Sequence, residues 1–517
     1  MSWSTRRLGS LLVLVALVLA GLGAMAPRAD AHANLVRSDP GSDAVLPNAP
    51  RQVQLWFSED PDSAFTEIRV LDSAGQRVDQ GGTKAVPGDR LAVVTAVHEL
   101  APGSYTVAWK ALSAVDGHVT RGAFAFTVGL DQASAGIVLP ADEGYSATFP
   151  LSVLVRWLNY LGLAGLGAFF LFVPFVLLPA LRATPAVAIS ESDSVGQARR
   201  LALASWVVAI VATLLLAVYQ ANEASGAGLF AAGPLVTLLT GTRFGTLWWT
   251  RLALLLVLGA LVWQWPRLRT VRENWPHALG FALLASVLAT QALGSHSAGA
   301  PTATWVAIAL DWLHLVGVVA WIGGIVHLLV QLPILARAGS RADSAKVLAA
   351  TVSRFSRLAT ISVAVLAATG IYQTWLLVGS LDALLGTDYG WTLLLKLALV
   401  APLVALGGVN QFGWAPRLTR LATTAAKTAA AAGAGLERRF TFTVGAEVGL
   451  AVLLLGVVGG LTSIEPARDA ILSQGIRRTV TAADLRADVR VQPGIAGLNV
   501  FQVRVTENGR PAANVER

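Results

Sequence analysis

Residues 303–335 read ATWVAIALDWLHLVGVVAWIGGIVHLLVQLPIL, an almost continuous apolar stretch that contains one carboxylate and two histidines. A helix needs about 20 predominantly apolar residues to cross a hydrocarbon core of about 30 Å. This stretch is long enough to cross a bilayer and either to tilt within it or to extend beyond it. It is too long for a strand of a soluble domain, and it therefore indicates a membrane protein.

The composition of the 517-residue chain supports the same class. Hydrophobic residues make up 54% of the chain and charged residues 14%, whereas soluble proteins carry about 25% charged residues. An ordinary soluble enzyme and a disordered chain are therefore excluded. The chain has no cysteine, and its two methionines are Met1 and Met25. Any metal site in the mature chain must therefore use histidine, carboxylate, backbone or terminal-amine ligands.

Eight apolar stretches, including the one quoted, are long enough to span a bilayer. They lie near 151–180, 199–221, 247–265, 276–295, 303–335, 350–379, 390–413 and 440–463. With the N-terminal part outside, the loops after the first, third, fifth and seventh stretches are cytoplasmic. Most loop arginines and lysines lie there, as the positive-inside rule requires, and the loop after the second stretch has only Arg243. The net charge of +8 thus follows from topology, and nucleic acid is not an expected partner.

Residues 1–31 have the pattern of a secretory signal peptide. Arg6 and Arg7 precede an apolar region, and Ala29-Asp30-Ala31 is an A-x-A cleavage site. Cleavage there makes His32 the first residue, whose free amine and ring nitrogen can chelate a metal together. The alternative is an uncleaved anchor helix, with His32 as an ordinary linker residue.

Residues 32–129 are predicted to form a soluble β domain outside the cytoplasm. Five short segments alternate or run apolar, with turn residues between several of them: Gln52–Phe57, Thr66–Leu71, Leu91–Val97, Ser104–Lys110 and Gly122–Val128. Short strands at a spacing of roughly ten residues are typical of an Ig-like antiparallel sandwich. Residues 130–149 are predicted to be a linker.

The motif Asp116-Gly117-His118 precedes the last predicted strand. Residues i and i+2 of an extended segment project to one side, so these two side chains can converge on one ion. With the His32 chelate they would supply three nitrogens and one oxygen, a set that suits Cu(II). The alternative for Asp116 and His118 is a solvated turn, and His98 is expected to be a surface histidine.

This region resembles the CopC family of exported copper-binding β-sandwiches. The resemblance rests on His32–Leu35, Pro40–Ser42, Leu55–Glu59 and Ser113–Phe126. It implies a Cu(II) ion bound by the amine and ring of His32, by Asp116 and by His118. Some members also have a methionine-rich Cu(I) site, for which this chain lacks the methionines.

Ionisable residues within apolar spans are costly and usually mark a functional pathway. The predicted topology places them in two tiers. The outer tier contains His296, Asp311, His314 and Lys396, and the inner tier contains His327, Asn410 and Glu447. The alternative is that these groups pair only to hold helices together, and an Asp311–Lys396 ion pair is the obvious candidate.

Residues 150–465 resemble the CopD membrane family of copper-resistance proteins. The segments that carry this resemblance are Thr240–Gly245 with Arg251, Gly294–His296, Asp311–Leu315, Ala320–Gly324, Lys396–Asn410 and Arg439–Glu447. The resemblance implies movement of copper across the inner membrane, generally inward. Because the mature chain lacks sulfur ligands, a thiol or thioether relay for Cu(I) is excluded.

Residues 466–517 are predicted to form a short extracytoplasmic β tail. Leu485–Val491 and Asn499–Thr506 alternate like strands, and a turn signal follows them. Two strands do not make a stable sheet alone. The segment resembles the start of a YtkA-like β-sandwich.

The predicted function is therefore a non-enzymatic one. The chain is expected to be a multi-pass protein of the inner (cytoplasmic) membrane that captures Cu(II) outside the cytoplasm. It would pass copper to the histidines of the membrane domain, for import or homeostasis. Its expected partners are copper ions and the lipid bilayer, with periplasmic copper proteins and copper within the membrane domain left open. The alternatives are a haem-binding or redox membrane protein, and a non-transporting copper sensor or assembly factor.

Overall fold

The structure is a computed structural model. It describes residues 33–130, 149–184, 191–268, 275–300, 303–337, 341–417, 420, 426–474, 476–482, 484–492, 500–507 and 510–511. The predicted signal peptide, the residue His32 and most of the predicted linker lie outside the described residues.

The N-terminal domain is a sandwich of two four-stranded sheets. One sheet has the order β1 (Leu35–Asp39), β3 (Gln52–Phe57), β6 (Asp89–Ala96) and β5 (Lys84–Val86); the other has β2 (Val45–Leu46), β8 (Val119–Val128), β7 (Gly103–Leu112) and β4 (Glu67–Leu71). All five predicted strands are present. The sequence did not indicate β1, β2 and β5, which have five residues or fewer. Pairing is antiparallel except between β2 and β8, which are parallel.

Alternating apolar residues hold the two sheets together. In β3, Val53, Leu55 and Phe57 are buried and their neighbours are more exposed. Phe57 packs edge-on against Trp109 of β7, with ring centroids 5.3 Å apart. Each fully buried side chain of this size contributes about 1.5–3 kcal/mol of transfer free energy. The period-two pattern of the sequence therefore determines which face of each strand enters the core.

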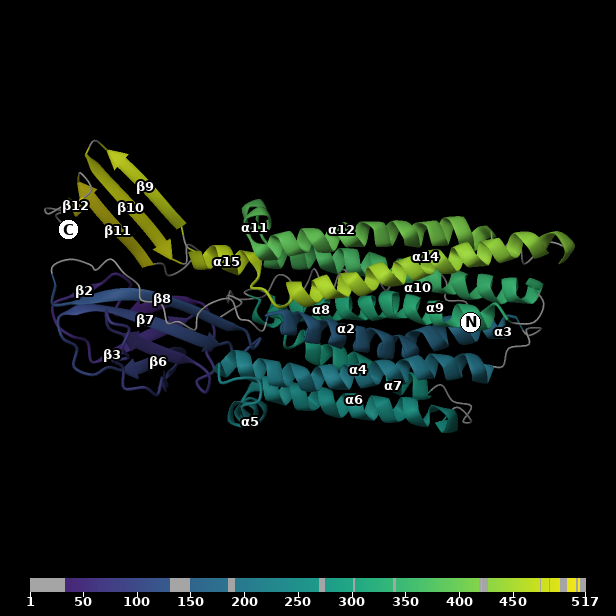
Figure 1. Ribbon diagram of the computed structural model, residues 1–517, viewed down its shortest axis with the longest axis horizontal. Coiled ribbons are helices and arrows are strands. Elements are labelled where there is room, and N and C mark those ends of the chain that lie inside the picture. Colours follow the sequence, from purple (N-terminus) through teal and green to yellow (C-terminus); the bar gives the residue numbers. More distant parts are fainter. Residues whose placement is uncertain are drawn as a thin grey trace.

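The second part of the molecule is a bundle of long helices that lie roughly along one direction (Figure 1). The main helices are α2 (Phe149–Phe172), α4 (Glu191–Ser225), α6 (Arg243–Leu268), α7 (Trp275–Ala292), α8 (Thr304–Val318), α9 (Gly324–Leu335), α10 (Arg341–Leu377), α12 (Asp388–Gly408) and α14 (Ala426–Leu461). Shorter helices are α3 (Leu178–Arg182), α5 (Ala232–Gly241), α11 (Leu381–Gly386) and α15 (Ala467–Gln474). Helix α2 is central, since it packs against α4, α14 and α9.

Seven helical segments of the described residues are long and apolar enough to cross a membrane. They are Phe149–Arg182, Glu191–Ser225, Arg243–Leu268, Thr304–Leu335, Asp343–Leu377, Asp388–Arg417 and Arg438–Leu461. Seven of the eight predicted spans correspond to these segments. The stretch near 276–295 forms α7, whose 18 residues measure about 27 Å. Helix α7 includes polar residues at both ends, such as His277 and Gln291, and packs between α6 and α8.

The stretch at 303–335 forms α8 and α9, joined without a break by the π-helical turn η3 (Val319–Gly323). Two more π-helical turns, η1 (Val173–Leu177) and η4 (Val409–Trp414), follow α2 and α12. Gly323 of η3 faces the backbone of α2 so closely that a Cβ atom would collide with the carbonyl of Ala164. Glycine is therefore required where these two helices cross.

The C-terminal tail forms a four-stranded antiparallel sheet with the order β12 (Arg510–Pro511), β11 (Val500–Glu507), β10 (Leu485–Gln492) and β9 (Ile476–Ala482). The two predicted strands correspond to β10 and β11. Strands β9 and β12, which the sequence did not indicate, extend the sheet on either side. The sheet lies at the same end of the bundle as the sandwich (Figure 1).

Candidate metal centre

The motif Asp116-Gly117-His118 lies in the turn between β7 and β8. Gly117 has a φ of +74°, which glycine adopts without strain. The backbone N–H of His118 donates to Asp116 Oδ1 at 3.0 Å, and the N–H of Gly117 donates to the carbonyl of Ser113 at 3.1 Å. The expected extended geometry is therefore wrong. A turn brings the two side chains together, and His118 Nδ1 lies 3.2 Å from Asp116 Oδ2.

Buried hydrogen bonds at the base of the turn fix its shape. Ser113 Oγ donates to Glu59 Oε2 at 2.8 Å and accepts from the backbone N–H of Val115 at 3.1 Å. Glu59, Ser113 and Asp116 are all buried. Burial of polar groups is tolerated only when they are hydrogen-bonded. The carboxylate of Asp116 therefore sits on a rigid support.

His296 of the helical bundle joins this pair. It begins the 3₁₀ turn η2 (His296–Gly299), which follows α7. Its Nδ1 lies 3.6 Å from Asp116 Oδ2, and its ring centroid lies 4.3 Å from that of His118. One potential ligand atom from each of Asp116, His118 and His296 can be chosen so that all lie within 4.8 Å of one another. The prediction placed His296 in a membrane tier, but the structure places it against the sandwich.

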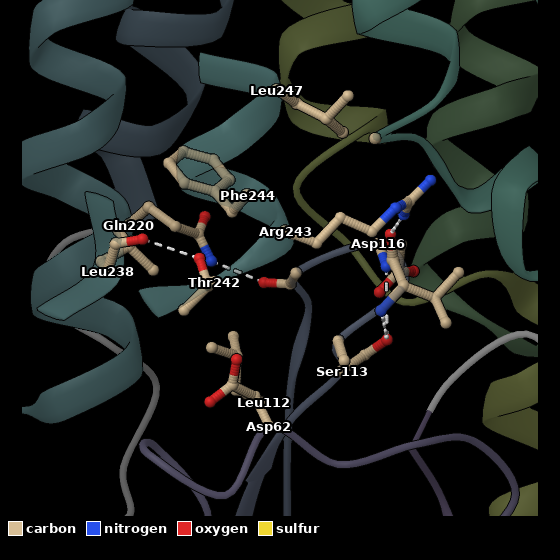
Figure 2. Close-up of a pocket in the computed structure, with 14 residues that line it drawn as sticks. Asp62, Leu112, Ser113, Asp116, Gln220, Leu238, Thr242, Arg243, Phe244 and Leu247 are labelled. Atoms are coloured by element: carbon tan, nitrogen blue, oxygen red, sulfur yellow. Dashed lines mark hydrogen bonds between the residues drawn. The ribbon is translucent and has the colours of Figure 1, made fainter. Parts of the chain in front are cut away.

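Two polar side chains of the bundle hold the turn in place. Arg243, at the start of α6, donates to the carbonyl of Val115 and, at 2.9 Å, to the carbonyl of Leu293. Gln220 of α4 donates to the carbonyl of Gly117 at 2.5 Å. Figure 2 shows the side chains of Gln220 and Arg243 beside the loop that leads from Ser113 to Asp116.

Further contacts extend this interface along α4. Lys110 Nζ donates to the carbonyl of Ser225 at 3.1 Å, and Arg121 donates to the carbonyl of Glu223 at 3.3 Å. Burial at this interface lowers the pKa of Lys110, an effect that the nearby Glu67 partly offsets. These bonds anchor β7 and β8 of the sandwich to α4.

An apolar cluster forms the centre of the same interface. It consists of Phe65 and Leu112 of the sandwich and Ala221, Ala224 and Leu238 of α4 and α5, all of which are buried. The two parts of the molecule therefore share a dry core, as stable interfaces do.

A cavity of about 20 Å³ lies between this core and the turn that contains Asp116 and Gly117. Asp62, Gly117, Thr242 and Phe244 are among its lining residues (Figure 2). Burial raises the pKa of Asp62, although the backbone N–H of Ala64 acts in the opposite direction. The cavity has room for about one water molecule, so a larger ligand does not fit.

Asp311 supports the loop that carries His296. Ser295 Oγ lies 2.7 Å from Asp311 Oδ2 and accepts from the backbone N–H of Ser297. Gln373 of α10 donates to Asp311 Oδ1 at 2.9 Å. No ion pair between Asp311 and Lys396 is found among the residues that the structure describes. The alternative of an Asp311–Lys396 ion pair therefore has no direct contact to support it, and the carboxylate of Asp311 accepts from neutral donors instead.

His314 lies one helical turn beyond Asp311 in α8. Its Nδ1 lies 2.8 Å from Thr369 Oγ1 of α10, and its Cε1 is near the position that a side chain at Gly370 would take. The residues of the predicted outer tier are therefore spread over three elements, with His296 in η2 at the sandwich, Asp311 and His314 in α8, and Lys396 in α12.

The residues of the predicted inner tier occupy two separate places. His327 is fully buried, with its Nε2 2.9 Å from the carbonyl of Gly165 and its ring stacked over Phe172. Asn410 accepts from Thr443 Oγ1 at 2.6 Å. Glu447 is buried in α14, one helical turn beyond Thr443. The hydrogen bonds of the described residues do not join His327 to Asn410 or Glu447.

Sequence reasoning did not assign functional roles to Arg243, Gln220, Ser295 and Gln373. One signal was available, because Arg243 is the only basic residue in the loop after the second apolar stretch. A basic residue is unusual in a loop on that side of a membrane. No comparable signal marked Gln220 or Gln373, whose partners lie far away in the sequence. His98, as predicted, is exposed.

Chemically, the cluster offers two imidazoles and one carboxylate. Imidazole and carboxylate ligands suit Cu(II). The described part of the site lacks sulfur, because the chain has no cysteine and neither methionine lies within the described residues. The donor set therefore fits a divalent ion of the copper type.

Three family models match the chain. They are the CopC domain at residues 35–129, the copper resistance protein D-like N-terminal domain at 146–303, and copper resistance protein D at 349–461. Together they cover the sandwich and most of the bundle.

The chain is also similar to individual copper proteins. Copper transport protein CutJ of Bacillus subtilis is 28% identical over 501 residues, which cover 94% of this chain and 84% of that protein. Copper resistance protein D of Pseudomonas syringae pv. tomato is 30% identical over 330 residues, which cover 62% of this chain and 98% of that protein. The crystal structure of CopC from Methylosinus trichosporium OB3b is 32% identical and covers 20% of this chain and all of that chain, with a TM-score of 0.18.

The sandwich, the bundle of apolar helices and these matches define a multi-pass membrane protein of the copper-resistance class. The chain belongs to the copper resistance protein D family, with a CopC domain fused in front of the membrane domain. The resemblances to CopC and CopD inferred from sequence motifs are thus confirmed.

Proposed function

We propose that this protein captures Cu(II) outside the cytoplasm and passes copper into its helical bundle, for import or homeostasis. The capture site in the sandwich consists of Asp116 and His118, together with the amine and ring of His32 at the mature N-terminus. The observation that carries the proposal is the position of Asp116 and His118. They lie at the end of the sandwich that packs on the bundle, so that a captured ion has only a short distance to travel.

The route within the bundle begins beside the capture site. Ser295 precedes His296 in the same loop and is hydrogen-bonded to Asp311 of α8, and His314 lies one turn further along α8. Each offers an oxygen or nitrogen ligand at increasing depth. Asp311 and His314 both face α10, through Gln373 and Thr369. The inner residues His327, Asn410 and Glu447, and Lys396 of α12, would act later on the route.

Binding is tested by competition titration of Cu(II) into the full-length protein. His118→Ala should lower Cu(II) affinity by at least tenfold, because it removes a ligand. His98→Ala, which removes an exposed histidine of the same domain, is the matched control and should bind Cu(II) like the wild type. Equal affinity of both variants and the wild type would overturn the proposed site.

Transport is tested in liposomes that contain the purified protein and a copper-sensitive dye. Copper should cross the membrane with the wild type and more slowly with His118→Ala. Copper binding without any transport would instead support a sensor or assembly factor. A Soret band in the absorption spectrum of the purified protein would support the haem alternative.

A further inference from the structure

We propose that His296 of the membrane domain coordinates the same copper ion as Asp116 and His118, so that one ion is held jointly by the sandwich and the bundle. This inference rests on the proposed function, since it adds a ligand to the proposed capture site. It assigns His296 to the step at which copper passes from one domain to the other.

The distances within the cluster are those of ligands around one ion. Metal–nitrogen bonds of about 2.0 Å place two ligands about 2.8 Å apart at right angles and about 4 Å apart on opposite sides. Asp116 Oδ2 lies 3.2 Å from His118 Nδ1 and 3.6 Å from His296 Nδ1. Both imidazoles thus approach the same carboxylate oxygen at a spacing that a single ion would produce.

Burial favours a cation at this place. The side chain of Asp116 is 0% exposed and that of His296 8% exposed. An ionised carboxylate that leaves water needs compensation by an opposite charge or by a metal. Pairing of Asp116 with one histidine would already satisfy that need, but imidazoles from both domains lie beside this carboxylate.

Arg243 holds the two ligand-bearing segments at a fixed separation. Its guanidinium donates to the carbonyl of Val115, next to Asp116, and to the carbonyl of Leu293, three residues before His296. The rigid fork of arginine suits this double contact better than the point charge of lysine. Arg243 is therefore a positioning residue for the joint site.

Joint coordination has a consequence for transfer. An ion that already has one ligand from the bundle need not be released to solvent before it enters the membrane domain. The ion can leave Asp116 and His118 one at a time while it stays bound to His296, and this completes the transfer. Ser295 and Asp311 lie immediately behind His296 and offer the next oxygen ligands.

The experiment uses the full-length protein with Cu(II) chloride as the probe, followed by competition titration and electron paramagnetic resonance. The variants are His296→Gln, His118→Gln and the control His98→Gln. We expect His296→Gln to lower affinity by about tenfold or more and to remove one nitrogen from the superhyperfine pattern. The control should match the wild type in both measurements.

The outcomes separate this inference from the proposed function. If His118→Gln weakens binding and His296→Gln changes neither affinity nor nitrogen count, the joint site is refuted and the capture site stands. If neither variant changes them, both proposals fail. Circular dichroism of each variant in detergent, compared with the wild type, establishes that the protein is folded. A variant that fails this comparison is replaced by His296→Asn or His118→Asn.

Discussion

Removal of the Arg243 side chain gives the sharpest test of how the two domains cooperate. In Arg243→Met the aliphatic bulk is largely kept, but the hydrogen bonds to Val115 and Leu293 are lost. A hydrogen bond of this kind contributes about 0.5–1.5 kcal/mol net, so that the pair contributes about 1–3 kcal/mol. Because Arg243 is exposed, solvent screening places the effect near the lower end of that range.

This free energy translates into copper affinity if Arg243 acts through the joint site. A loss near 1 kcal/mol corresponds to a roughly fivefold weaker Kd. The assay is competition titration of Cu(II) into the full-length protein at fixed ionic strength. Arg51→Met, which removes an exposed arginine on the edge of the sandwich, is the charge-matched control and should leave the Kd unchanged.

A double-mutant cycle with His296→Gln decides between positioning and a general effect. If Arg243 positions the loop of His296, Arg243→Met should weaken binding much less in the His296→Gln background than in the wild type, because coupled residues are not additive. Full additivity of the two losses, or an unchanged Kd for Arg243→Met alone, would refute the reasoning.

Three further predictions concern other parts of the molecule. Gly323→Ala should lower the melting temperature in detergent, because its Cβ atom would be forced against Ala164 at a cost of about 1–3 kcal/mol. The control Gly460→Ala has open space around it and should not lower the melting temperature. Burial raises the pKa of Asp62, so that wild-type stability falls as pH rises from the ordinary carboxyl pKa to the raised pKa of the folded state. The stability of Asp62→Asn relative to wild type should therefore increase across this pH window and level off above it; a pH-independent difference in melting temperature would contradict this. His314→Ala should reduce copper transport in liposomes while Cu(II) affinity of the capture site stays at the wild-type value, and normal transport would exclude His314 from the route.

Local patterns allowed much of the fold to be predicted. The strands of the sandwich core alternate clearly, and the long apolar stretches could only be helices of a membrane protein. Short edge strands such as Val45–Leu46 have too few residues to show a period. Helix α7 lies close to the length at which an apolar helix spans a bilayer, and it is the predicted span that is missing from the seven segments.

The site was only half predictable. Asp116 and His118 are neighbours in sequence, so their association followed from the motif, although a turn rather than an extended segment produces it. His296 could not be paired with them, because no local pattern reports how the sandwich docks on the bundle. The docking depends on shared apolar residues such as Leu112 and Leu238, whose burial is a tertiary property.

The contacts of Asp311 make the capture site responsive to the interior of the bundle. Asp311 connects the loop of His296 to α8 and, through Gln373, to α10. A shift of α8 against α10 would therefore move His296 relative to Asp116 and change the affinity for the ion. By thermodynamic reciprocity, occupancy of the site must shift the balance between those helix arrangements by the same free energy. If the cluster binds copper as proposed, its occupancy would therefore be communicated to the helix arrangement of the bundle.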